Sequence, residues 1–218
     1  MTLAEINQQL KAMKAEKIKP LPTEEVIKDD PFEQFLLWFE VALQSASSDP
    51  SAMVLATVDA QGYPDTRMVL LKELEYQRFL FFTGYDSKKA KDLHHQKIAA
   101  LNFYWPDLLY QVRIRGAVEK LDRQKNESYF STRARDSQLS AASWTQSAVI
   151  HGREELEERI QQQAAQYKDQ AIPCPENWGG YALCPFEYEF FQRRQWRRHE
   201  RLLYRLNGKT WDRTWLAP

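Results

Sequence analysis

Cysteine is scarce in this chain, whose 218 residues include only Cys174 and Cys184. The two lie ten positions apart without a CxxC pair or a companion histidine cluster, so we expect neither a disulfide framework nor a metal site. An excess of charge of one sign is also missing, because 30 Lys and Arg balance 30 Asp and Glu. This balance excludes a globally basic nucleic-acid-binding protein and an acidic tail protein.

Long apolar runs are absent too. No run approaches the roughly 18 to 20 residues that a membrane helix needs, and the N-terminal segment MTLAEINQQLKAMKAEK lacks the apolar stretch of a signal peptide. We therefore expect a cytoplasmic protein without membrane contact. The motifs GxGxxG, Walker A, GxSxG and HExxH do not occur. What is present is 43% hydrophobic and 13% aromatic residues, enough for a packed core.

Residues 1–30 differ in composition from the rest of the chain. They mix lysines with acidic residues and carry few large apolar side chains, and Pro20 and Pro22 prevent a long continuous helix. We interpret residues 1–30 as a mobile N-terminal arm and residues 31–218 as a single domain.

A helix is predicted over about residues 31–46. Asp30 followed by Pro31 is typical of a helix start, and apolar residues then recur at three- and four-residue spacing. These are Phe32, Phe35, Leu36, Phe39 and Leu43.

Short β-rich runs separated by Gly, Pro and Asp begin at Ala52 and return after Gly179, ending in a hairpin at Asn207-Gly208. Between them, DSKKAKDLHHQ predicts a short polar helix, and about 122–169 is helical, with a charged, outward-lying second half. Long parallel crossovers are absent. The pattern predicts an α+β protein built mainly on an antiparallel β-sheet or barrel with helical insertions.

Basic residues occur within the predicted strands and helices at positions where packing of a core does not require them. Arg67 and Lys72 flank the run MVLL, and period two puts them on opposite faces of a strand. Ser87-Lys88-Lys89 opens a helix after Thr83-Gly84, where free backbone N–H groups favour an anion such as phosphate. For Arg67 and Lys72, solvated strand ends are the alternative.

A polar stripe marks the helical insertion. Tyr129, Arg133 and Ser137 are spaced by four, so a continuous helix would align two hydroxyls and a guanidinium on one side. Such a set could grip a phosphate. An exposed polar stripe is the alternative.

The densest basic segment is QRRQWRRHERLLYR, residues 192–205. If it is extended, Arg197, His199 and Arg201 project from one face, and the arginines keep the His199 imidazole neutral. Basic residues interleaved with aromatic ones can also bind RNA, although the neutral whole-chain charge opposes that reading. A solvated hairpin is the third interpretation.

Taken in order along the chain, these clusters are similar to those of the pyridoxamine 5'-phosphate oxidase family. The resemblance covers about residues 31–218. It rests on RMVLLK at 67–72, FT at 82–83, SKK at 87–89, Gln111 in YQVRIRG, SxRxRDSQ at 131–138, Gln146-Ser147, EFFQ at 189–192, RRHER at 197–201 and the closing WDRTWLAP. It implies an FMN-binding split β-barrel and a homodimer with FMN at the subunit interface.

The resemblance also implies roles for individual residues. The FMN site would comprise Arg67, Met68, Val69, Leu70, Leu71, Lys72, Phe82, Thr83, Lys88, Lys89, Gln111, Gln146, Ser147, Phe191 and Arg201. The substrate would contact Lys72, Tyr129, Arg133, Ser137, Arg197 and His199, of which Arg197 and His199 would be catalytic. Two phosphorylated ligands would explain separate basic clusters in a neutral protein.

The implied reaction is FMN-dependent oxidation of pyridoxamine or pyridoxine 5'-phosphate to pyridoxal 5'-phosphate, with O2 reduced to H2O2. Phe191 stands where the family usually has Trp, Lys88 stands where it has Arg, and the arm lacks the family's Arg-x-x-Tyr element. A related flavin oxidase acting on another aromatic substrate, such as a phenazine precursor, is the closest alternative. A non-enzymatic flavin- or RNA-binding module is a more distant one.

Overall fold

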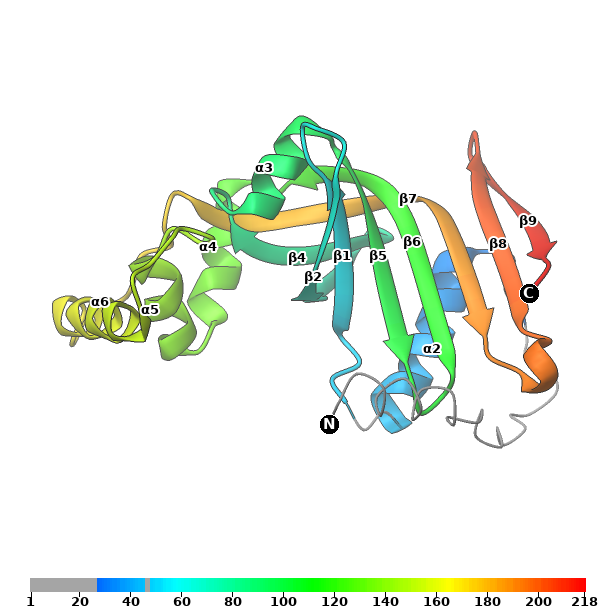
Figure 1. The fold of residues 1–218 in the computed structure, drawn as a ribbon, viewed down its shortest axis with the longest axis horizontal. Coiled ribbons are helices and arrows are strands. Elements are labelled where there is room, and N and C mark those ends of the chain that lie inside the picture. The colour runs from blue at the N-terminus through cyan, green and yellow to red at the C-terminus, as the bar shows by residue number, and fades with distance from the viewer. Residues whose placement is uncertain (1–26, 46–47) are drawn as a thin grey trace, which may run out of the picture.

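The computed structural model of the protein describes residues 27–45 and 48–218 (Figure 1). Most of the expected N-terminal arm, residues 1–26, lies outside the described residues. The helices are α2 (Pro31–Ser45), α3 (Lys88–His95), α4 (Arg123–Thr132), α5 (Arg135–Ser143), α6 (Arg153–Gln166) and a 3-10 turn, η1 (Gln195–Arg197). None of the helices within these two ranges is long and apolar enough to cross a membrane.

Nine strands form one antiparallel sheet in the described chain. They are β1 (Ala52–Val58), β2 (Pro64–Leu70), β3 (Glu73–Glu75), β4 (Arg78–Gly84), β5 (Ile98–Trp105), β6 (Tyr110–Lys120), β7 (Trp178–Gln192), β8 (Glu200–Asn207) and β9 (Thr210–Leu216). The order is β2-β1-β5-β6-β7-β4-β3, and β8 and β9 continue from β7. The sheet curls into a half-barrel, with the helical insertion projecting at one end (Figure 1). The predicted α+β, mainly antiparallel class is confirmed.

The fifteen-residue strand β7 organises the sheet. One edge pairs with β6 along its length, while the other pairs first with β4, up to Leu183, and then with β8, from Glu187 onward. Between the pairs Arg115–Glu187 and Gly116–Pro185 the register shifts, which leaves Phe186 of β7 without a partner on β6 and lets β7 bend. A Cβ at Gly116 would lie 2.4 Å from the Cys184 carbonyl oxygen, so this close approach requires glycine.

Helix α2 closes the main core, as its apolar spacing predicts. The Asp30 carboxylate accepts the backbone N–H of Phe32 at 2.7 Å and caps the helix start. Phe35 is fully buried and packs edge-on against Phe79 at 4.8 Å, and Trp38 stacks on Tyr110 at 4.0 Å. The predicted helix over 31–46 is confirmed and ends at Ser45.

The helical insertion has a small core of its own, formed by Phe130, Leu139, Ile172, Cys174 and Trp178. No residue of α6 is buried, which agrees with its expected place on the outside. Helix α3 is less exposed than its polar sequence suggests, since Lys89, Ala90, Asp92 and Leu93 are buried.

The continuous helix that would align Tyr129, Arg133 and Ser137 does not form. Helix α4 ends at Thr132, and the next two residues are extended before α5 begins. The Gln138 side chain donates to the Phe130 carbonyl oxygen at 2.8 Å, which satisfies an end carbonyl that the next turn of α4 would otherwise bond. The chain therefore turns at Arg133.

Candidate active site

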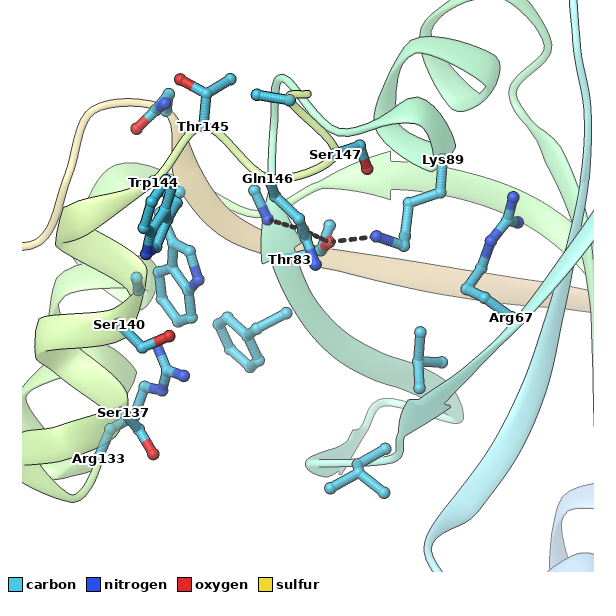
Figure 2. A pocket seen from close by; sticks show the side chains of 18 of the residues that line it. Arg67, Thr83, Lys89, Arg133, Ser137, Ser140, Trp144, Thr145, Gln146 and Ser147 are labelled. Atoms are coloured by element: carbon cyan, nitrogen blue, oxygen red, sulfur yellow. Dashed lines mark hydrogen bonds between the residues drawn. The ribbon is translucent and has the colours of Figure 1, made fainter. Parts of the chain in front are cut away.

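A cavity of about 900 Å³ lies between the sheet edge and the helical insertion (Figure 2). Strands β2 and β4 form one side, and α4, α5 and the loop after α5 form the other. The residues predicted from the sequence that line it are Arg67, Met68, Val69, Leu70, Lys72, Phe82, Thr83, Lys89, Tyr129, Arg133, Ser137, Gln146 and Ser147. The fold thus gathers thirteen of these candidate side chains, which come from distant parts of the sequence, around one space.

One end of the cavity is cationic. Arg67 reaches it from β2, and Lys89 reaches it from the first turn of α3. The Lys89 ammonium is largely buried and donates to the Thr83 hydroxyl at 3.1 Å. Burial, followed by repulsion from Arg67, lowers the pKa of Lys89. An anion placed here would relieve both effects.

Hydrogen bonds hold the loop after α5 against the cationic end of the cavity. Thr83 Oγ1 donates to Gln146 Oε1 at 2.7 Å, and the Gly84 backbone N–H donates to the same oxygen at 2.9 Å (Figure 2). Ser147 has a left-handed backbone, with φ of 70°, and its hydroxyl accepts the backbone N–H of Lys88 at 3.4 Å. This strained conformation places a hydroxyl beside the α3 N-terminus.

Two members of the predicted FMN set, each next in sequence to a lining residue, do not line the cavity themselves. Leu71 is buried in the main core. The Lys88 ammonium pairs with Asp65 at 2.9 Å and with Asp92 at 3.5 Å, and its side chain is not among those lining the cavity. The hydrogen bond to Asp65 raises the pKa of Lys88. The backbone N–H of Lys88 contacts the loop that closes this end.

The other end of the cavity is aromatic and holds unpaired donors. The Tyr129 ring stacks on Phe82 with centroids 3.8 Å apart, and the Arg133 guanidinium lies 4.7 Å from the Trp178 ring centroid. Arg133 NH1 and Trp144 Nε1 are buried without a hydrogen-bond partner in the described part of the chain. Burial lowers the pKa of Arg133. Buried donors of this kind need an acceptor, and a phosphate ester supplies several.

The remaining candidates form a second cluster outside this cavity. Gln111 on β6 pairs with Phe191 on β7, and Phe191 pairs with Arg201 on β8, so the three lie in a row across the sheet. The His199 ring lies 5.1 Å from that of Phe191. Arg201 Nε donates to Glu189 at 2.8 Å and lines a neighbouring groove of about 650 Å³.

The segment 197–201 is not extended throughout. Arg197 ends the 3-10 turn with φ of 58°, and β8 begins only at Glu200. The chain must reverse direction between β7 and β8, and the Arg194 backbone N–H closes the loop on His199 Nδ1 at 3.2 Å. Arg197, His199 and Arg201 therefore do not share one strand face.

The two clusters lie at opposite ends of β7. Trp178, at its start, lines the cavity, and Phe191 stands thirteen positions later. At about 3.3 Å per residue the strand path between them is roughly 40 Å. In the described residues the second cluster does not line the cavity of its own chain.

Sequence reasoning missed four residues around the cavity. Trp144 and Trp178 line it, while Thr57 and Asp92 contact Arg67 from behind, with Thr57 Oγ1 2.7 Å from NH1 and an Asp92 oxygen 3.7 Å from NH2. The sequence has seven tryptophans, and no local pattern distinguishes Trp144 and Trp178 from the others. Likewise, no local pattern distinguishes Thr57 from other strand residues or Asp92 from other helix residues. Their importance comes from tertiary placement.

Comparison with known proteins gives a consistent result. Residues 39–167 match the family model described as pyridoxamine 5'-phosphate oxidase, and residues 178–218 match the pyridoxine 5'-phosphate oxidase C-terminal dimerisation region. A Legionella pneumophila protein named pyridoxine/pyridoxamine 5'-phosphate oxidase is 46% identical, covering 90% of this chain and 91% of its own. One of the same name from Leptospira biflexa is 40% identical, covering 94% and 97%.

Solved structures agree on the fold. PhzG from Burkholderia lata 383, in complex with tetrahydrophenazine-1-carboxylic acid, superimposes with a TM-score of 0.84 at 25% identity, covering 92% of this chain and 98% of that one. A pyridoxamine 5'-phosphate oxidase-related, FMN-binding protein from Nostoc punctiforme gives 0.69 at 18% identity, covering 87% and 98%. With a family model matching more than half of its length and relatives at 40–46% identity, the chain belongs to the pyridoxamine 5'-phosphate oxidase family.

Proposed function

We propose that this protein uses FMN to oxidise pyridoxamine 5'-phosphate and pyridoxine 5'-phosphate to pyridoxal 5'-phosphate, with O2 as acceptor and H2O2 as product. The names of its relatives support the substrate class. The observation that carries the proposal is the single cavity with basic, hydroxyl-bearing groups at both ends: Arg67, Lys89 and Thr83 at one, and Tyr129, Arg133 and Ser137 at the other. Two phosphorylated ligands, FMN and substrate, match two such ends.

The residues present fit FMN at the Lys89 end. A phosphate there finds two cations, the Thr83 and Ser147 hydroxyls and the start of α3. The β2 residues 68–70 and Gln146 then lie where the rest of the cofactor can contact them. When bound, FMN supplies the hydride acceptor and the reactivity toward O2.

The chain's own residues bind and orient the substrate. Arg133, Tyr129 and Ser137 hold its phosphate, with the unpaired Arg133 NH1 as the strongest donor available. Phe82 and Trp178 supply flat apolar walls that exclude water. Fixing the phosphate in this way sets the position of the reacting carbon.

We infer that the second cluster reaches the same site from the partner subunit of a homodimer. Phe191, Arg197, His199 and Arg201 all fall inside the region 178–218 that matches the family's dimerisation region. None of them lines the cavity of their own chain. In the dimer, Gln111, Phe191 and Arg201 would complete the FMN site, and Arg197 and His199 would cover the substrate ring.

A flavin oxidase acting on another aromatic substrate is the second candidate. The similarity to PhzG, whose structure holds a phenazine-type acid, favours it. The unpaired Arg133 beside the Tyr129 and Ser137 hydroxyls favours a phosphorylated substrate instead. Nothing in the described residues adds support to RNA binding, and the neutral charge of the chain opposes it.

An anaerobic visible spectrum tests the proposal. The purified protein should be yellow, and adding pyridoxamine 5'-phosphate without O2 should bleach the flavin absorbance. Readmitting O2 should restore the colour and yield H2O2 and pyridoxal 5'-phosphate. A yellow protein that does not bleach would move the substrate to the second candidate, and a colourless protein that cannot be reconstituted with FMN would refute the proposal.

A further inference from the structure

A buried carboxylate lies behind the cationic end of the cavity. Asp92, on the inner face of α3, is 5% exposed, and its Oδ2 accepts the Thr57 hydroxyl at 2.7 Å. Thr57 lies on β1 and is 1% exposed. Neither residue belongs to the set that lines the cavity. A buried charge in this place needs a structural or functional reason.

The Thr57 hydroxyl connects Asp92 to Arg67. Arg67 NH1 donates to Thr57 Oγ1 at 2.7 Å and to the Leu55 carbonyl oxygen at 3.2 Å. A hydroxyl has a single proton, and because Thr57 gives it to Asp92, the lone pairs of its oxygen remain for Arg67. Asp92 thereby fixes the direction of the Thr57 hydroxyl, which in turn fixes the guanidinium of Arg67.

The same groups also form a cluster of charges. Arg67 NH2 lies 2.8 Å from Asp65 and 3.7 Å from Asp92, and the Lys88 ammonium bridges the same two acids at 2.9 and 3.5 Å. The four side chains balance one another, and Arg67 is left 17% exposed at the cavity wall. An arginine held in this way loses little rotamer freedom when an anion binds.

We propose that Asp92 is a positioning residue for the FMN phosphate, acting through Thr57 on Arg67. This inference rests on the proposed function, in which Arg67 binds that phosphate. Asp92 has two opposing effects, because its hydrogen bond orients Arg67 while its negative charge repels the phosphate. Removing the hydrogen-bond acceptor should therefore weaken FMN binding, and removing the charge alone should not.

The test measures flavin binding to the apoprotein by quenching of flavin fluorescence, with FMN and with riboflavin, which lacks the phosphate. Asp92→Ala should raise the Kd for FMN on the order of tenfold and leave that for riboflavin unchanged. Asp92→Asn keeps an acceptor for Thr57 and should bind FMN at least as tightly as the wild type. Asp86→Ala is the control, since exposed Asp86 also adjoins α3 but bonds Asn177 instead.

A double-mutant cycle isolates the route through Arg67. In an Arg67→Leu background, Asp92→Ala should add no further loss of FMN affinity. If Asp92→Ala does not fold, Thr57→Val, which removes the connecting hydroxyl, should weaken FMN binding, and Thr57→Ser should restore it. Thermal unfolding of each apoprotein confirms that the variants compared are folded.

The outcomes separate this inference from the proposed function. Wild-type protein that binds FMN no more tightly than riboflavin would refute the phosphate site, and the role of Asp92 would fail with it. Preference for FMN in the wild type together with unchanged binding by Asp92→Ala would overturn the positioning role alone. So would an Asp92→Asn variant as weak as Asp92→Ala, or an Asp92→Ala effect that persists undiminished without Arg67.

Discussion

The backbone N–H of Arg194 donates a hydrogen bond to Nδ1 of His199 over 3.2 Å. A ring nitrogen that accepts a hydrogen bond carries no proton, so the neutral imidazole holds its proton on Nε2. Burial, followed by the charges of Arg193 and Arg197, lowers the pKa of His199 below its ordinary 6.5. At neutral pH His199 is therefore an uncharged ring with one N–H donor to offer.

Replacing a neighbouring charge should shift this titration. Arg197→Met removes one of the repelling cations, so the pKa of His199 should rise toward 6.5, as measured by NMR titration of the His199 ring protons. Arg198→Met is the control, because Arg198 is exposed and is not among the causes of the shift. Equal shifts in both variants would contradict a specific effect of Arg197.

In turnover assays Arg197→Met should lower activity much more than FMN content.

Binding of the substrate phosphate should depend on Arg133 and not on the nearby Arg135. Arg133→Leu removes the guanidinium whose NH1 is buried and unpaired, and it should raise KM for pyridoxamine 5'-phosphate about 10- to 100-fold, while FMN affinity stays unchanged. Arg135→Leu is the matched control, because the Arg135 guanidinium bonds the Gln170 and Tyr167 carbonyl oxygens instead of facing the cavity. Steady-state kinetics measure both, and a similar KM change in the control would argue against phosphate binding by Arg133.

The free energy of unfolding should depend on pH because the Glu189 carboxylate is ionised in the folded protein. Burial alone would raise its pKa, but hydrogen bonds from Arg201 and Arg113 outweigh burial and hold it below the ordinary 4.5. A lowered folded-state pKa gives stability that is present above 4.5 and is lost as the pH falls through the folded value. Glu189→Gln should cost about 1–3 kcal/mol of unfolding free energy at pH 7, and the difference from wild type should shrink at acid pH.

Denaturant unfolding at several pH values measures this effect. Glu176→Gln is its control, since that side chain is 94% exposed and should change stability little. A Glu189→Gln deficit that does not vary with pH would contradict an ionic origin.

Mixed dimers test whether the site is shared between subunits. Arg67→Leu disables the cavity, and His199→Ala disables the second cluster, so each homodimer should be inactive. Unfolding and refolding the two together gives about half mixed dimers, each with one intact site, so activity should recover to about one quarter of wild type. If both clusters served a site within one chain, mixing would restore nothing.

The features that the sequence predicted correctly are those that depend on residues close together in the chain. The start of α2 follows from Asp30, Pro31 and the apolar spacing behind them, and these effects act within two helical turns. The local pattern at Arg67 favoured a solvated strand end, and at Lys89 it favoured an anion only weakly. The family resemblance, which combines many such short segments, predicted that these residues belong to one site.

What sequence reasoning could not provide depends on tertiary contacts. The Asp65 and Asp92 carboxylates that neutralise Lys88 come from β2 and α3, and only their packing shows that the ammonium is taken. The break at Arg133 depends on a Gln138 side chain folding back, which four-residue spacing does not reveal. The turn at Arg197 likewise follows from where β7 and β8 must meet.

The central strand also sets the order of events during synthesis. β7 separates β6 from β4 in the sheet, yet it leaves the ribosome after both of them. Until Trp178–Gln192 is made, the two halves of the sheet have no strand between them, and β4 lacks its long partner. Until then the nascent chain carries exposed strand edges, which favours protection by chaperones.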